Sequence, residues 1–322
     1  MTGTAVPAGL EAQFGAHRSF LWALCYRLTG NAADADDLVQ ETFLRAAQRP
    51  PARTDVPWRP WLVRVALNLG RDLLRRRRRR REGTWLPAPI ETGDEPRHPA
   101  IGRDEPPSFE PTAGAQGCPA ARYDLLESVS FAFLLALEAL TPRQRAVLLL
   151  RDVFDYSVRE TAEALAMSEA NVKTTLLRAR RVMEAYERAR RPVTPEMQKR
   201  TGQTVERFLT LLSGGDAAGL ESLLAEGVRS VSDGGEFPAA RLPIVGRDKV
   251  IRLYATLAER LGPGVRVQVR TLNGLPAAVI DVEGAPPGWA PRTVLLFRVD
   301  DRGIVEEMYA VLASRKLTAL RP

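Results

Sequence analysis

Two amphipathic helical patterns separated by the short turn Ala166-Met167-Ser168 constrain this chain more than any other feature. Ser168 suits the N-cap of the second helix, because a serine hydroxyl accepts a hydrogen bond from a first-turn amide. Four basic residues follow on that helix: Lys173, Arg178, Arg180 and Arg181. A helix-turn-helix with a basic second helix places side chains in the major groove of DNA. The segment therefore predicts a nucleic-acid-binding module.

The second helix of this motif divides into an apolar and a polar face. The apolar face is expected to pack inward and consists of Val172, Leu176, Ala179 and Met183. The polar face gives the candidate DNA-contacting residues: Ser168, Asn171, Lys173, Thr174, Arg178 and Arg181. Asn and Arg pair with base edges, whereas Lys and Thr more often reach phosphate. The alternative is a helical hairpin that only packs.

The N-terminal part also reads as helices, over Leu10–Leu28, Asn31–Gln48 and Trp58–Arg81. The third carries interleaved aromatic, polar and basic side chains, namely Trp58, Arg59, Trp61, Arg64, Asn68 and Arg71. Such a face suits contact with unstacked bases and phosphates. Taken alone, the two tryptophans would more often be core residues.

The positive charge of the chain is concentrated near its start. Residues 1–81 hold 15 Lys and Arg against 7 Asp and Glu, largely because of the run Arg75–Arg81. A charge run alone indicates a solvated helix end, but beside a helix-turn-helix it favours phosphate contact. Residues 82–121 hold 2 basic against 7 acidic residues and many Pro and Gly, which predicts a flexible linker. Trp85-Leu86-Pro87 within it is expected to dock, because an exposed Trp forfeits its burial energy.

The remaining residues form two further domains. Helices are expected over Tyr123–Ala139, Pro142–Phe154, Val158–Ala166 and Ser168–Ala189. The last 130 residues predict an α+β domain with helices packed on a curved antiparallel sheet. Its expected helices are Pro195–Leu212, Ala217–Leu224 and Arg247–Leu261, and its expected strands are Val228–Ser232, Val265–Leu272, Ala277–Val282, Thr293–Val299 and Ile304–Leu312, with a loop over Asp233–Gly246.

Composition excludes several classes of protein. No apolar run approaches the roughly 20 residues of a membrane span, and the N-terminus lacks the pattern of a signal peptide. Cys25 and Cys118 are too few for a disulfide framework and have no metal-ligand spacing. We therefore expect a cytoplasmic chain without a metal, a cofactor or a membrane partner.

Three segments in order resemble a known family: Gly30–Ala46, Trp58–Arg76 and the helix-turn-helix. They are similar to regions two and four of the extracytoplasmic-function (ECF) class of bacterial sigma factors. The resemblance implies a subunit that binds core RNA polymerase, at the β′ clamp helices and the β flap, and promoter DNA.

The resemblance also implies roles for particular residues. The acidic helix would dock on the clamp helices through Asp36, Asp37, Gln40 and Glu41. Without the resemblance, the three carboxylates would indicate only a solvated face. The loop Pro51–Pro57 would capture a flipped base of the minus-ten element through Arg53, Thr54 and Asp55. The helix that begins at Trp58 would hold the melted strand. Residues 168–181 would read the minus-thirty-five element in duplex form.

The C-terminal domain is similar to the SnoaL-like cone of the NTF2-like superfamily. Ser232–Ala240, Leu272–Ile280 and the Trp-Leu-Pro triplet resemble motifs of one sigma group that carries such a domain. The residues implied in interdomain regulation are Trp85, Leu86, Pro87, Asp233, Gly234, Gly235, Asn273 and Gly274. Catalysis is disfavoured, because neither histidine lies in this domain, and the cone leaves open a small ligand.

The sequence thus predicts a multidomain protein with two all-α sigma domains and a C-terminal α+β cone. Its expected parts are region two at 10–81, the linker at 82–121, region four at 122–190 and the cone at 194–318. The expected function is promoter-specific transcription initiation, modulated by the cone, with no catalytic residues. The alternatives are a stand-alone helix-turn-helix regulator with a sensing domain and an enzyme tethered to a DNA-binding module.

Overall fold

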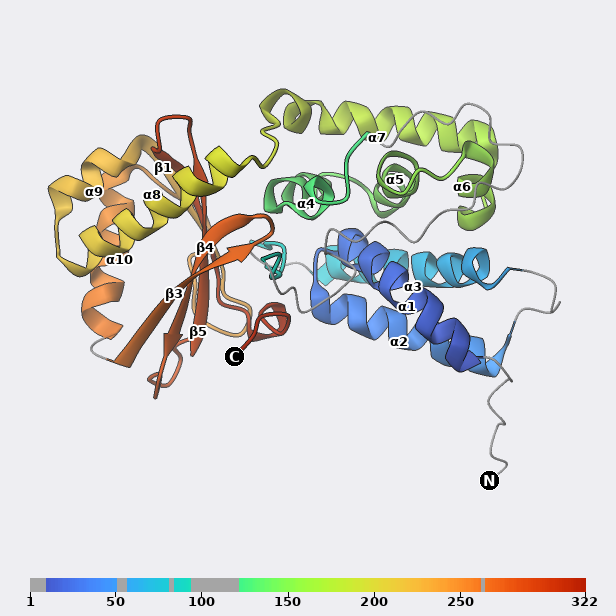
Figure 1. Ribbon diagram of the computed structural model, residues 1–322, viewed down its shortest axis with the longest axis horizontal. Coiled ribbons are helices and arrows are strands. Elements are labelled where there is room, and N and C mark those ends of the chain that lie inside the picture. The colour runs from blue at the N-terminus through green and yellow to red at the C-terminus, as the bar shows by residue number, and fades with distance from the viewer. Residues whose placement is uncertain (1–9, 51–56, 81–83, 94–121, 262–263) are drawn as a thin grey trace. The chain divides into compact units, whose positions relative to one another are not determined.

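The computed structural model describes residues 10–50, 57–80, 84–93, 122–261 and 264–322. The chain divides into two compact units (Figure 1). The helical unit contains a first module, residues 10–80, and a second module, residues 122–190. The C-terminal unit contains residues 84–93 together with Arg191–Pro322. Among the described helices, none combines the length and the apolar character that crossing a bilayer requires.

The first module is a bundle of three helices: α1 (Leu10–Thr29), α2 (Ala32–Gln48) and α3 (Trp58–Arg80). Asn31 separates the first two, because its side-chain Oδ1 accepts the backbone N–H of Ala33 at 3.0 Å and so caps α2. The C-terminal half of α1 is buried without interruption from Phe20 to Thr29, so this helix is the core of the bundle. The three expected helices agree with these bounds to within one residue.

The second module contains a 3₁₀ turn η2 (Glu127–Val129), α4 (Phe131–Leu137), α5 (Pro142–Leu148), a π turn η3 (Leu149–Val153), α6 (Val158–Leu165) and α7 (Glu169–Ala189). The expectation of one helix from Tyr123 to Ala139 is wrong. Ser130 is extended, with ψ 144°, and its Oγ accepts the N–H of Phe133, so it caps a shorter α4. A serine that satisfies a first-turn amide begins a helix more readily than it continues one.

The turn of the helix-turn-helix has the expected residues. Ala166 is left-handed, with φ 51°, and it ends α6 after Leu165. Ser168 then caps α7, because its Oγ accepts the N–H of Asn171 at 3.3 Å. The expected second helix of this domain is in two parts, since α5 continues into the wider π turn η3 at Leu149.

The C-terminal unit is an α+β cone, as the sequence predicts. Its helices are α8 (Pro195–Ser213), α9 (Ala217–Leu223) and α10 (Arg247–Leu261), and its strands are β1 (Leu224–Asp233), β2 (Ile244–Val245), β3 (Val265–Leu272), β4 (Leu275–Val282), β5 (Arg292–Val299) and β6 (Val305–Val311). The strand order is β2-β1-β6-β5-β4-β3. The sequence predicts an antiparallel sheet, but the observed sheet is not entirely antiparallel. The last strand, β6, pairs with β1, and these two strands are parallel. β2 lies in the expected loop.

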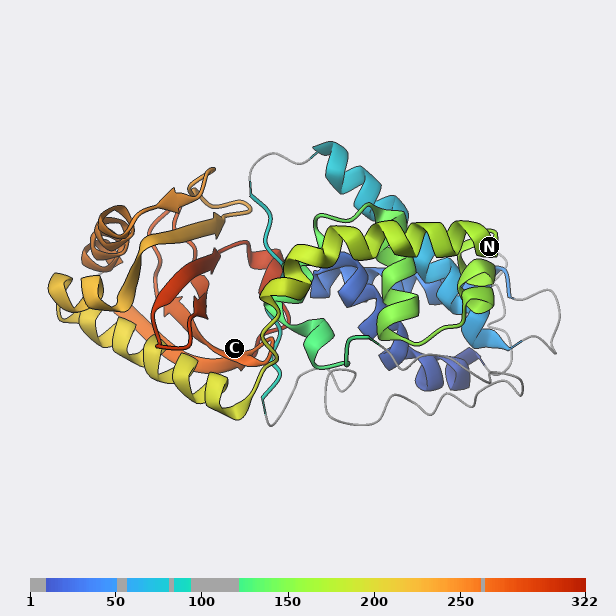
Figure 2. The same ribbon diagram turned by 90° about the horizontal axis from the view of Figure 1, so that it is seen from above.

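The helices of the cone cover one side of the curved sheet (Figures 1 and 2). Phe208 of α8 lies at the centre of this core, with ring centroids 5.7 Å from Tyr254 and 5.3 Å from Phe297. Alternate strand residues point to opposite faces, and Val279 and Val294 on the other face are buried as well. Part of each face of the sheet is therefore buried.

Replacing Phe208 by Ala is expected to destabilise the C-terminal unit by about 3–5 kcal/mol, because it empties the centre of this aromatic core. Calorimetry of the full chain should show the transition of the C-terminal unit at a lower temperature. The control, Leu242→Ala, removes a side chain that is 78% exposed and should change stability by less than about 0.5 kcal/mol. Equal shifts for the two variants would contradict this packing.

Candidate nucleic-acid interface

The exposed face of α7 carries five of the six residues predicted to read duplex DNA, and the sixth, Ser168, caps the helix. Val172, Leu176, Ala179 and Met183 are buried, as their spacing predicts. On the opposite side, Asn171, Lys173, Thr174, Arg178 and Arg181 are exposed. The face therefore offers two guanidinium groups, one ammonium group and one amide to an approaching nucleic acid.

Two other residues of α7, Arg180 and Leu177, have surroundings that the sequence did not predict. Arg180 is not part of the exposed face, because its Nε and Nη2 donate to the carboxylate of Asp152 at 2.9 and 2.6 Å. That hydrogen bond raises the pKa of Arg180 and fixes α7 to η3. Leu177 is 53% exposed between Thr174 and Arg178, and sequence reasoning missed it. The sequence did contain a signal for Leu177, because it is an apolar residue on the polar face of a basic helix. Such a side chain can contact a thymine methyl group.

A groove of about 300 Å³ lies between the end of α2 and the first half of α3. It brings together two predicted residues, Trp61 and Asn68, and four others that sequence reasoning did not select: Arg45, Gln48, Arg49 and Val65. The ring of Trp58 meets that of Trp61 edge to face, with centroids 6.4 Å apart. An aromatic ring, an amide and guanidinium groups around one groove suit an unstacked base and its phosphate. The predicted base-capturing residues Arg53, Thr54 and Asp55 lie outside the described residues.

The other predicted residues of α3 do not line this groove. Arg64 is exposed. The guanidinium carbon of Arg59 lies 4.0 Å from the ring centroid of Phe20, in a cation–π contact. Burial, and then the positive charges of Arg75 and Arg143, lower the pKa of Arg71. Arg143 belongs to the second module, so Arg71 lies close to that module.

The acidic residues predicted to dock on polymerase share the polar face of α2. Asp36, Asp37 and Gln40 are exposed, and Glu41 forms an ion pair with Arg45, with 2.8 Å between Oε1 and Nε. The indole N–H of Trp22 donates to Asp36 Oδ1 at 2.9 Å, which orients that carboxylate. The face therefore presents negative charge on a rigid helix.

Within the C-terminal unit, the Trp-Leu-Pro triplet is held by a buried ion pair between Asp233 and Lys316. The backbone N–H of Leu86 donates to Asp233 Oδ2 at 2.7 Å, and Lys316 Nζ donates to the carbonyl of the same residue at 2.5 Å. Lys316 Nζ also lies 4.1 Å from the ring centroid of Trp85. The Asp233–Lys316 pair thus satisfies both the backbone N–H and the carbonyl of Leu86. Leu86 and Pro87 are themselves buried.

A second set of contacts holds the residues that follow. Asn273 is left-handed, with φ 51°, and its Oδ1 accepts the N–H of Ile90 at 3.2 Å. The N–H of Gly274 donates to Thr92 Oγ1 at 2.7 Å. The buried Glu91 carboxylate accepts from Arg270 at 3.0 Å and from Arg321 at 2.6 Å. We call residues 84–93 the strap.

The two glycines after Asp233 are required by close packing. A Cβ on Gly234 would lie 2.2 Å from the carbonyl oxygen of Phe237. Gly235 has φ 58°, and a Cβ there would lie 2.5 Å from Ala313 Cβ. These glycines let the segment after β1 fold beside the Lys316 turn, so they support the strap indirectly.

The strap differs from the linker that the sequence predicts. That prediction treats residues 82–121 as one flexible segment, whereas residues 84–93 lie on the C-terminal unit with buried apolar side chains. The reason is local composition: Leu86, Ala88 and Ile90 alternate with prolines and are buried at 0–1% exposure. The acidic residues from 94 to 121 lie outside the described residues.

Comparison with known proteins identifies the family to which the two helical modules belong. Residues 14–80 match the model of sigma-70 region 2, and residues 130–183 match that of sigma-70 region 4. The ECF RNA polymerase sigma factor SigJ of Mycobacterium tuberculosis is 34% identical over 269 residues, which are 82% of this chain and 78% of that protein. SigG of the same organism is 37% identical over 217 residues, 62% of this chain and 56% of that protein. The chain belongs to the family of ECF RNA polymerase sigma factors.

A solved structure extends the likeness to the C-terminal unit. The crystal structure of the extracytoplasmic function sigma factor SigJ from Mycobacterium tuberculosis is 29% identical, covers 96% of this chain and 98% of that one, and has a TM-score of 0.68. The predicted combination of two sigma regions with a C-terminal α+β domain is confirmed.

We expect the strap to detach from the C-terminal unit more often at low pH. Burial raises the pKa of Glu91, but hydrogen bonds from Arg321 and Arg270 outweigh it, so the pKa in the folded chain lies below the usual 4.5. The stabilisation by this carboxylate is therefore complete above about pH 4.5 and is lost as the pH falls through the lower folded value. Hydrogen exchange should show residues 84–93 opening in that window.

The matched variant for this prediction is Glu91→Gln, which keeps the shape of the side chain and removes its charge. Strap exchange in the variant should be faster and should show much less dependence on pH below 4.5. If wild type and variant followed the same pH profile, Glu91 would not hold the strap.

Proposed function

We propose that this chain binds core RNA polymerase through its first module and directs it to promoters through both modules of the helical unit. The observation that carries the proposal is that one helical unit presents three separate surfaces. These are the acidic face of α2, the groove between α2 and α3, and the basic face of α7. A sigma factor needs a polymerase contact, a single-strand contact and a duplex contact, and each surface has the chemistry for one of them.

The basic face of α7 would read the minus-thirty-five element in the major groove. Asn171 and Arg178 reach base edges, Lys173, Thr174 and Arg181 bind the flanking phosphates, and Ser168 keeps the start of the helix in place through its cap. The salt bridge from Arg180 to Asp152 holds α7 against the rest of its module, so the reading helix is rigid before it meets DNA.

The groove between α2 and α3 would take the melted minus-ten strand. Trp61 offers a stacking surface, with Trp58 beside it, and Asn68 offers an amide to a base edge. Arg45, Arg49 and the exposed Arg64 supply positive charge for the phosphates. Flipping a base costs a few kcal/mol, which stacking and edge hydrogen bonds at this groove would offset.

The polymerase contact would use the acidic face of α2. Asp36, Asp37, Gln40 and Glu41 would dock on the β′ clamp helices, and the second module would meet the β flap. Charge complementarity of this kind mainly sets the association rate and the register of docking.

The C-terminal unit would modulate these contacts through the strap. While residues 84–93 are held by Asp233 and Lys316, only residues 81–83 separate the end of α3 from the cone. Residues 84–93 cannot then be part of a flexible linker between the first and the second module. Release of the strap would lengthen the tether that joins them, and tether length sets the effective concentration of a linked module.

The interior of the cone is packed rather than set up for chemistry. Phe208, Tyr254, Phe297 and Met308 are buried together, and the hydroxyl of Tyr254 is satisfied by Ser230 Oγ at 3.0 Å. Asp233 is committed to Lys316 and Leu86. We therefore assign the cone a regulatory role and propose neither a small ligand nor a catalytic step for it.

Run-off transcription with purified core polymerase tests the proposal. The intact chain should direct transcripts from specific start sites. Arg178→Ala should reduce them by roughly fivefold or more, because a bidentate base contact contributes about 1–3 kcal/mol. The matched control is Arg188→Ala, an exposed arginine at the end of the same helix, which should have little effect. Tight binding of duplex DNA by the free chain, with no transcripts when polymerase is present, would instead indicate a stand-alone regulator.

The regulatory part has its own test in Lys316→Met, which keeps the aliphatic stem but leaves Asp233 and the Leu86 carbonyl without their donor. Loss of one partner of a buried charge pair costs about 3–5 kcal/mol, so the strap should detach. Polymerase affinity or promoter output should then change relative to wild type. Unaltered values for both, with a strap shown to be detached by hydrogen exchange, would remove the regulatory role.

A further inference from the structure

An apolar strip lies on the face of α7 that is predicted to read duplex DNA. Leu177 is 53% exposed there, and among the large apolar side chains of the described residues only Leu242, in the C-terminal unit, is more exposed. Thr174 and Ala170, one and two turns earlier, are exposed as well. Residues spaced by i, i+4 and i+7 share one side of a helix. The side chain of Leu177 and the methyl groups of Thr174 and Ala170 therefore form one strip.

The strip lies in the part of α7 that would enter the major groove. Recognition helices contact base edges with their N-terminal residues. Ala170 and Thr174 belong to the first two turns after the Ser168 cap, and Leu177 follows one turn later. The buried residues of α7 lie on its opposite side, so the strip faces away from the core of the second module.

Polar residues flank the strip on both sides. Asn171 and Arg178 lie on one side and Lys173 on the other, as the spacing of a helix requires. A duplex that binds these residues must therefore also lie against Leu177. An exposed leucine is ordinary on a protein surface, but this one lies between groups that would bind base edges and phosphates. The base pair that it meets has to be compatible with an apolar side chain.

The chemistry of the major groove identifies the matching base. Base-pair edges there carry hydrogen-bond donors and acceptors, and their one large apolar group is the C5 methyl of thymine. A donor or acceptor pressed against Leu177 would lose its hydration without gaining a partner. A thymine methyl group would instead exclude water together with the leucine side chain, and alanine and threonine methyl groups make the same kind of contact. The strip thus favours thymine and disfavours a base with a polar group at the same point.

We propose that Leu177, together with the methyl groups of Thr174 and Ala170, gives this chain its specificity for thymine in the upstream promoter element. This inference rests on the proposed function and concerns the sequence that the same face reads. The hydroxyl of Thr174 remains a phosphate contact, because only its methyl group belongs to the strip. A strip of this length, roughly 10 Å at about 1.5 Å per residue, spans no more than about three stacked base pairs. The preference for thymine is therefore confined to a short run of adjacent positions.

Selection from a promoter library tests the inference with the full chain bound to core RNA polymerase. The library is duplex DNA with a randomised upstream element, and a barcode in each transcript identifies its template. Wild type should enrich thymine at one or more adjacent positions. Leu177→Ala should reduce that enrichment by roughly threefold or more and leave the other positions as in wild type, because it removes an apolar contact only. Leu177→Ile, which keeps an apolar side chain of equal size, should retain the enrichment.

A second measurement removes only the methyl group from the DNA. At an enriched position of a selected promoter, thymine is replaced by uracil, which lacks the C5 methyl and keeps the hydrogen-bonding groups. Run-off transcription by wild type should fall by roughly three- to fivefold, since one buried methyl group is lost. Leu177→Ala should transcribe both templates equally. The matched control Leu126→Ala removes a leucine that is 41% exposed and lies outside α7, and it should respond to uracil as wild type does.

The outcomes separate this inference from the proposed function. A wild type without a thymine preference, or an equal effect of uracil on wild type and Leu177→Ala, would overturn the thymine contact alone. A wild-type chain that transcribes no member of the library with core polymerase would overturn the proposed function instead. Alanine and glutamine are both good helix formers at an exposed position, so Leu177→Gln repeats the test if the alanine variant misfolds.

Discussion

A buried charged group needs a polar partner, and this requirement determines which distant segments of the chain contact each other. Arg27 and Arg145 join the two helical modules, and the pair of Asp233 and Lys316 joins the strap to the cone. Glu91 joins the same strap to the last residues of the chain. Each contact links segments that are more than 80 residues apart in sequence. Because desolvation offsets much of the pairing energy, such contacts specify an arrangement more than they stabilise it.

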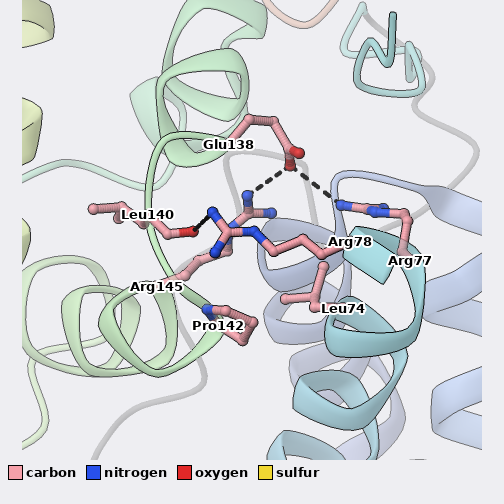
Figure 3. A pocket seen from close by; sticks show the side chains of 7 residues that line it. All are labelled: Leu74, Arg77, Arg78, Glu138, Leu140, Pro142 and Arg145. Atoms are coloured by element: carbon pink, nitrogen blue, oxygen red, sulfur yellow. Dashed lines mark hydrogen bonds and ion pairs between the residues drawn. The ribbon is translucent and has the colours of Figure 1, made fainter. Parts of the chain in front are cut away.

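This balance suits the proposed function, in which the two modules bind separate surfaces of core polymerase. The hydrophobic cores of the first module and the cone are continuous and keep each part folded. The contacts between modules are polar and can be exchanged for water, phosphate or another protein surface. The residues of α7 predicted to contact DNA and the acidic face of α2 are exposed, whereas Arg77 at the end of α3 is bound to Glu138 and Arg78 to the carbonyl of Leu140 (Figure 3).

Much of the fold followed from the sequence, because its elements have strong local signals. Asn31 and Ser168 are caps in the structure as their residue types predict, and α10 and β3 have the expected bounds. Local patterns could not show that Ser130 divides a helix or that β1 and β6 are parallel, since both depend on tertiary packing. The groove residues Arg45 and Gln48 were missed for the same reason: only the packing of α2 on α3 brings them to Trp61.

The most direct test of the account is the distance between the two modules in the free chain and in its complex with core RNA polymerase. Labels on α1 and α7 would report it by pulsed electron resonance. The account predicts a short distance in the free chain and a single, longer distance in the complex, since both modules then bind polymerase surfaces apart from each other. The same short distance in both states, in a complex that is competent for transcription, would contradict it.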